Sequence, residues 1–305
     1  MLVWFLHGAS VRHTGYADPL RSRLIEAFTQ CDRAVPEFYS SYWGDALGDA
    51  TETWGYVQQD LEAVKWDHPS VDLDDIFHYQ QRRAQLITGF FHDIFKYLNT
   101  NSGKEIRRTI ARQFLNFLTD YPFEDELHIV VHSLSGVILW DLLFSENYDT
   151  NDPAYYVRTA IRGLTASTQG HQVNLCSITT LGCPLLIFKD VVKVSSAPLQ
   201  QFARQRFDLP LRWVNVIHAS DVFAYPLRAN FGITDDLMLF RDHYLGERNF
   251  LKKNLGDVTM ALGLSSDHSR YWRSSRVSKL VLANLWGDLE TLTSDYSVLE
   301  LGEFD

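Results

Sequence analysis

Two serines lie close together in the stretch VVHSLSGVILW, residues 130–140. A serine hydroxyl is a weak nucleophile, so covalent chemistry requires a histidine that removes its proton and a carboxylate that orients the histidine. The stretch begins like a buried strand and continues like a buried helix, and a sharp turn between the two would expose a serine beside the helix N-terminus. Nucleophilic chemistry is therefore the first hypothesis that the sequence raises.

Two registers place a serine at the tip of this turn. Either Ser133 is at the tip, flanked at two residues' distance by Val131 and Ser135, or Ser135 is at the tip, flanked by Ser133 and Val137. The turn is crowded, so small residues are expected at the flanking positions. We favour Ser133, and the interpretation in which both serines only cap a buried helix stays open.

An acid and a histidine follow in the order serine, acid, histidine. Asp221 lies in a loop after the strand-like run WVNVIH, and His268 lies shortly before an amphipathic run that predicts the last helix. Asp190 is a competing acid because it also follows a strand-like run, and His243 is a competing base because it also comes after Asp221. We favour Asp221 and His268.

The serine turn and the N-terminal run both resemble elements of the α/β-hydrolase superfamily of esterase and lipase type. HSLSG resembles the nucleophile elbow G-H-S-L-G-G, with Val131 and Ser135 where that pattern has glycines. LVWFLHGAS resembles the strand and His-Gly loop that form half of an oxyanion hole. The resemblance implies that the backbone N–H groups of Ala9 and Leu134 hold the developing oxyanion.

Three later segments resemble the same superfamily. DVFAYPL, which begins at Asp221, resembles the D-P-V-A-Y-P-L type segment, with Val222 in place of proline. SDHSRYW resembles the loop that carries the catalytic histidine, His268. LGCPL resembles a G-S-P-L turn, with Cys183 in place of serine, and we expect a buried structural thiol there. The resemblance spans residues 7 to 268, nearly the whole chain, and is to bacterial-type members with a large helical insertion.

The resemblance implies an α/β-hydrolase fold and a serine hydrolase that cleaves an ester or related acyl bond through Ser133, Asp221 and His268, without a cofactor. An apolar acyl chain or a lipid is the favoured substrate if the aromatic residues of the insertion line the site. Two alternatives remain. The departures from the family pattern also fit a non-catalytic protein of this fold that binds a ligand or partner, and a hydrolase gated by a ligand or partner fits equally.

Short apolar runs alternate with stretches of helical spacing, which predicts a mostly parallel sheet with helices on both faces. The expected strands are Leu2–Leu6, 35–43, Ile129–Val131, Leu175–Leu181 and Trp213–Ile217. Ala9, Ser133 and Asp221 would each follow the end of one of these strands. A helix over Val277–Leu285 would follow His268.

Residues 45–120 are far more than one crossover needs and predict a helical insertion. Apolar residues recur at helical spacing over 90–98 and 106–118, and Asn101-Ser102-Gly103 separates the two runs. This hairpin either packs on the sheet or forms a lid over a pocket. The sequence has no repeat and no Pro/Gly/Ser linker, so we expect a single domain over residues 1–305.

Composition limits the partners. The net charge of −10 disfavours a nucleic-acid surface, because such a surface needs excess Lys and Arg. Three widely spaced cysteines suggest neither a disulfide framework nor a metal site. The run MLVWFL lacks the basic leader of a signal peptide, and no apolar run reaches membrane-spanning length, so we expect a cytoplasmic protein.

Overall fold

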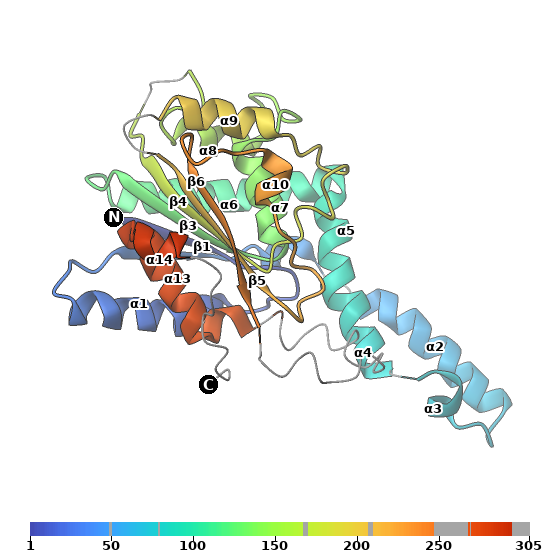
Figure 1. The fold of residues 1–305 in the computed structure, drawn as a ribbon. Helices are drawn as coiled ribbons and strands as arrows, with labels where there is room; N and C mark the ends of the chain where they lie inside the picture. Colours follow the sequence, from blue (N-terminus) through green and yellow to red (C-terminus); the bar gives the residue numbers. More distant parts are fainter. Residues whose placement is uncertain are drawn as a thin grey trace.

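The computed structural model describes residues 1–48, 51–78, 80–166, 170–206, 210–246, 268 and 270–294. In these residues six strands form one sheet in the order β2-β1-β3-β4-β5-β6, and every neighbouring pair is parallel (Figure 1). The strands are β1 (Leu2–Leu6), β2 (Glu37–Ser41), β3 (Glu126–His132), β4 (Asn174–Leu181), β5 (Arg212–His218) and β6 (Leu239–Leu245). The chain therefore has an α/β fold with a parallel sheet, as predicted.

Helices cover both faces of this sheet, which explains the continuous apolar character of β1 and of Ile129–Val131 in β3. The α-helices are α1 (Asp18–Gln30), α2 (Thr51–Asp67), α3 (Leu73–Ile76), α4 (Gln80–Gln85), α5 (His92–Leu98), α6 (Thr100–Asp120), α7 (Leu134–Leu143), α8 (Pro153–Thr159), α9 (Ser196–Arg204), α10 (Arg228–Phe231), α13 (Ser275–Trp286) and α14 (Leu289–Thr293). The shorter turns are η1 (Thr14–Ala17), η2 (Gly44–Leu47), the π-helical η3 (Leu86–Phe91) and η5 (Arg270–Arg273). Helices α1 and α13 lie on one face, and α6 and α7 lie on the other (Figure 1).

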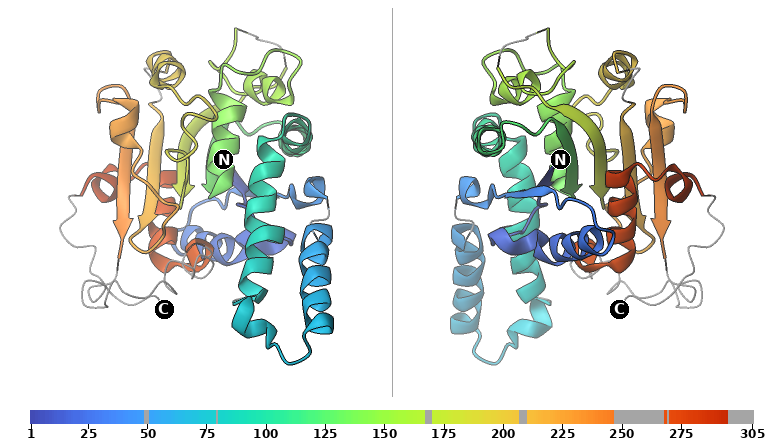
Figure 2. Two further views of the ribbon diagram at one scale, coloured as in Figure 1. Left: turned by 90° about the vertical axis from the view of Figure 1, so that its right-hand side faces the viewer. Right: turned by 90° about the vertical axis from the view of Figure 1, so that its left-hand side faces the viewer.

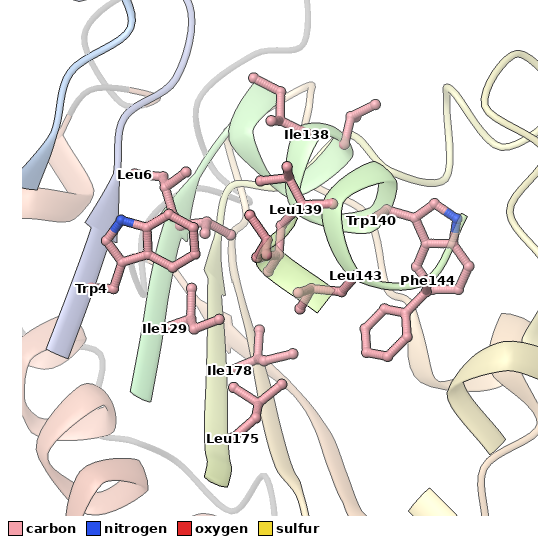
Figure 3. Packing of buried hydrophobic residues seen from close by; sticks show 14 of the residues in the cluster. Trp4, Leu6, Ile129, Ile138, Leu139, Trp140, Leu143, Phe144, Leu175 and Ile178 are labelled. Carbon is pink, nitrogen blue, oxygen red and sulfur yellow. The ribbon is translucent and has the colours of Figure 1, made fainter. Parts of the chain in front are cut away.

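The larger core lies between the sheet and helices α6 and α7. Leu139 of α7 lies over the strands that carry Ile129 and Ile178 (Figure 3). The Trp4 ring of β1 stacks on Phe114 of α6 with ring centroids 4.4 Å apart. Aromatic contacts of this kind add to the stabilisation from burial. This core fixes the ends of β1 and β3 relative to each other.

The boundary predicted inside the helical insertion was wrong. Asn101-Ser102-Gly103 does not separate two helices but belongs to the first turns of α6. The separation falls at Asn99, whose side-chain oxygen accepts hydrogen bonds from the backbone N–H groups of Asn101 and Ser102. Asparagine is a strong N-cap because its side chain satisfies the first free N–H groups of a helix. Helix α6 then packs on the sheet as the crossover from β2 to β3.

The rest of the insertion projects from the body of the molecule. Helix α2 runs beside the segment from α4 to α5, and the two form a hairpin. This hairpin extends beyond the edge of the sheet formed by the carboxyl ends of the strands (Figure 2). Helix α5 leads back from this hairpin and contacts α6. No helix among the described residues is long and apolar enough to cross a membrane.

The strand order changes direction between β1 and β3. From β1 the chain moves outward to β2, then crosses back over β1 to β3 and continues in the other direction. Connections at the carboxyl ends of such neighbouring strands diverge, and the gap between them is the usual ligand position in open α/β sheets. The loops after Leu6 and after His132 meet at this point.

Candidate active site

Ser133 lies at the junction between β3 and α7, in a backbone conformation that serine rarely adopts. Its φ is 55° and its ψ is −128°, whereas residues with a side chain strongly prefer negative φ. The Ser133 N–H donates to the carbonyl of Leu181 at 2.9 Å, and the Gly136 N–H donates to the Ser133 carbonyl at 2.9 Å. These contacts hold the strained turn, and such strain is common at functional sites.

The structure brings Ser133, His268 and Asp221 together. His268 Nε2 lies 2.6 Å from Ser133 Oγ, and His268 Nδ1 lies 2.9 Å from Asp221 Oδ2. Since a carboxylate only accepts, Nδ1 carries the proton and the lone pair of Nε2 faces the serine hydroxyl. The three residues thus form the hydrogen-bonded series that activates a serine nucleophile.

The Asp221 carboxylate is buried and accepts hydrogen bonds from three groups. Besides His268, the Tyr271 hydroxyl donates to Oδ2 at 2.8 Å, and the backbone N–H of Phe223 donates to Oδ1 at 3.0 Å. Burial alone would raise the pKa of Asp221, but the hydrogen bond from His268, together with those from the Phe223 N–H and Tyr271, outweighs it and lowers this pKa. Asp221 is therefore ionised at neutral pH.

His132 fixes the segment that carries His268. Its Nε2 lies 2.6 Å from the carbonyl oxygen of His268, so Nε2 carries the donated hydrogen. Burial lowers the pKa of His132 to about 3, which keeps the ring neutral. Ser266, Asp267 and Ser269, which belong to the same predicted loop, lie outside the described residues.

The loop after β1 lies directly against Ser133. A Cβ on Gly8 would lie 2.5 Å from the Cβ of Ser133, so only glycine fits at this position. The next residue is Ala9, and Leu134 is the first residue of α7, whose N–H has no partner within its helix. The two backbone groups predicted to hold an oxyanion therefore come from segments that meet at Ser133.

His7 holds the start of this loop. The ring Nδ1–H donates to the Gly8 carbonyl at 2.7 Å, and Nε2 accepts from the Trp43 N–H at 3.1 Å. The indole N–H of Trp43 donates to the His7 carbonyl at 3.1 Å, and the Ser135 hydroxyl donates to the same oxygen. Burial lowers the pKa of His7 to about 4, so the ring is neutral.

The competing residues lie elsewhere. Ser135 is fully buried. Its hydroxyl donates to the backbone carbonyl of His7 and accepts from the indole N–H of Trp43, so its partners include no imidazole nitrogen that could remove its proton. Asp190 lies in an exposed turn, and His243 lies on β6. Cys183 is buried as expected, and burial raises the pKa of its thiol to about 12, which makes it inert.

An apolar wall adjoins His268. The Phe223 ring centroid lies 5.3 Å from that of His268, and Phe90 of η3 lies 4.5 Å from Phe223. Phe91 contacts Phe90, and Phe95 contacts Phe91, and both of these outer rings are substantially exposed. The wall therefore continues from His268 to the surface of the insertion.

Sequence reasoning missed the roles of His132, Tyr271 and Trp43. His132 lies in the segment HSLSG and Tyr271 in SDHSRYW, but their partners are a backbone carbonyl and a carboxylate that only the folded chain brings near.

The described residues contain no group of His, Cys, Asp and Glu side chains that could hold a metal ion. No protein-family model matches this chain, and a comparison with curated proteins finds no match.

Proposed function

We propose that this protein is a serine hydrolase of the α/β-hydrolase type that cleaves an ester or a related acyl bond. The observation that carries the proposal is the hydrogen-bonded series from Ser133 through His268 to Asp221. The strained strand-turn-helix context of Ser133 and the chain order serine, acid, histidine also support it.

The reaction has two halves. His268 Nε2 takes the proton of Ser133 as Oγ bonds to the acyl carbon, and the N–H groups of Ala9 and Leu134 stabilise the negative oxygen that forms. His268 then gives the proton to the leaving alcohol as its bond to the acyl carbon breaks. In the second half, His268 deprotonates a water that attacks the acyl-serine, and the acid leaves as Ser133 regains its proton.

The surroundings of His268 favour an apolar acyl group. Phe223 and Phe90 present aromatic surface beside the histidine ring, and Phe91 and Phe95 extend that surface outward. Each methylene removed from water contributes about 0.8 kcal/mol to binding. We therefore assign the acyl chain of the substrate to this wall.

Intact-mass analysis after treatment with a fluorophosphonate tests the proposal. Wild type and Ser135→Ala should each gain one adduct, and Ser133→Ala and His268→Ala should gain none, because the reagent reacts with an activated serine. Ser135→Ala tests the other register of the turn, because it removes the second candidate hydroxyl and leaves Ser133 and His268 in place.

A folded wild type without an adduct would argue against the hydrolase. The departures at Val131 and Val222 would then favour a protein of this fold that binds a ligand without catalysis. Labelling that appears only after a ligand or partner is added would instead indicate a gated hydrolase.

A further inference from the structure

Asp93, on α5 of the insertion, is a fully buried carboxylate bound to the loop after β1. The backbone N–H of Ser10 donates to Oδ2 at 2.7 Å. The Arg12 guanidinium donates to both carboxylate oxygens at 2.8 Å. A bidentate, charge-assisted pair fixes the direction as well as the distance of its partners. Asp93 thus joins the insertion to the residues directly after Ala9.

The contact holds Ser10 in an unusual conformation. Ser10 has a φ of 65°, in the left-handed region that favours glycine, so outside contacts must hold it there. The π-helical turn η3 packs directly against it, since a Cβ on Gly89 would lie 2.8 Å from Ser10 Oγ. Such π-helical turns recur at functional sites.

The loop therefore has two anchors, one on each side of Ala9. The anchor before it consists of core groups, the His7 ring with Trp43 and Ser135. The anchor after it is Asp93, which belongs to the insertion. The direction of the Ala9 N–H depends on both anchors, because the peptide group between Gly8 and Ala9 can rotate only if the contacts on one side of it are lost.

We propose that Asp93 is a positioning residue for the oxyanion-binding N–H of Ala9 and acts through Ser10 and Arg12. Docking of the insertion on the sheet thereby completes the catalytic site. The inference rests on the proposed hydrolase function. It extends that function by making the insertion part of the catalytic apparatus as well as a wall for the substrate.

Turnover of a p-nitrophenyl ester by the full chain tests this role, with active sites counted by fluorophosphonate labelling. Asp93→Ala should lower kcat about 10²-fold, as the loss of an oxyanion donor does, and should change KM far less. Asp93→Asn should recover part of the loss, because its amide oxygen can still accept from Ser10. The pH dependence of kcat/KM should keep its apparent pKa values, since Ser133, His268 and Asp221 are untouched.

Asp152→Ala is the matched control. Asp152 is also a buried carboxylate that accepts a bidentate pair from an arginine, Arg107, and a hydrogen bond from one backbone N–H, that of Ala154. It lies before α8, outside the candidate site, so its removal should leave kcat per labelled site unchanged. Arg12→Gln, at a half-exposed position, should lower kcat in a fully folded protein.

Amide hydrogen exchange adds a readout that does not depend on turnover. In Asp93→Ala the Ser10 amide should exchange faster than in wild type, while the β3 amides stay protected. If the wild type is labelled, three results would overturn the inference about Asp93. These are a wild-type kcat in Asp93→Ala, an equal loss of kcat in Asp152→Ala, and a shift of the pH dependence of kcat/KM in Asp93→Ala. A wild type that is not labelled would overturn the proposed function, and this inference with it.

Discussion

Hydrogen bonds at Asp221 determine the state of the His268 ring. The carboxylate accepts from His268 Nδ1, so the basic nitrogen is the one that faces Ser133. Tyr271 and the Phe223 N–H occupy other positions on the same carboxylate and lower its pKa together with His268. Asp221 is therefore ionised at neutral pH and held in one orientation.

Asp221→Asn should lower kcat about 10⁴-fold with little change in fold, because the amide has the same shape but stabilises the wrong histidine tautomer. Steady-state kinetics on an ester, with circular dichroism to check the fold, measures the effect. Asp190→Asn is the control, since Asp190 is exposed and should tolerate the change. A comparable loss in Asp190→Asn would assign the acid to the earlier loop.

Ser133, Asp221 and His268 could be predicted from the sequence because each stands next to an apolar run or before a helix, in a fixed order. Asp93 could not. Its partners, Ser10 and Arg12, lie some eighty residues earlier, and no periodicity or spacing rule links a helix residue to a loop that far away. Local patterns determine strands and helices, whereas the tertiary contacts decide which side chains meet.

At the scale of elements, inner strands were easier to predict than edges. Strand β1 is buried along its full length and appears as a continuous apolar run, and the buried run Ile129–Val131 of β3 has the same character. Among the described residues, strand β6 pairs with β5 alone. It contains Arg241 and Asp242, so it lacks the continuous apolar pattern and was not predicted. The insertion was predicted to contain one helical hairpin, but its parts differ: α6 covers the sheet, whereas Phe90 of η3 lies beside Phe223 and near His268.

Phe90→Ala should reduce the preference for long acyl chains. Removing this ring exposes the wall beside Phe223, so kcat/KM for an octanoate ester should fall more than kcat/KM for an acetate ester, by about tenfold if roughly two methylenes lose their contact. Esters of increasing chain length give the measurement. Phe123→Ala is the control, since Phe123 is 98% exposed. An equal loss on both esters would place the acyl chain elsewhere.

At the scale of the whole molecule, the fold keeps several histidines neutral in its interior. Burial lowers the pKa of His7 to about 4, and the pKa values of His128 and His132 to about 3. In the unfolded chain a histidine titrates near pH 6.5. Between these values the unfolded chain binds protons that the folded protein does not, so stability falls as the pH falls. Asp141 opposes this in part, because burial raises its pKa to about 6.

His128→Gln should make the protein less sensitive to acid. His128 lies on β3, outside the candidate site, and its Nδ1 lies 2.7 Å from Ser177 Oγ, a contact that a glutamine amide can replace. With one fewer proton taken up on unfolding, the free energy of unfolding should fall less steeply with decreasing pH, by about 1.4 kcal/mol per pH unit between pH 6 and pH 4. Urea unfolding at pH 7.5, 6 and 5 gives this slope. Parallel curves for wild type and His128→Gln would contradict this expectation, because they would show that His128 binds its proton in the folded state as well.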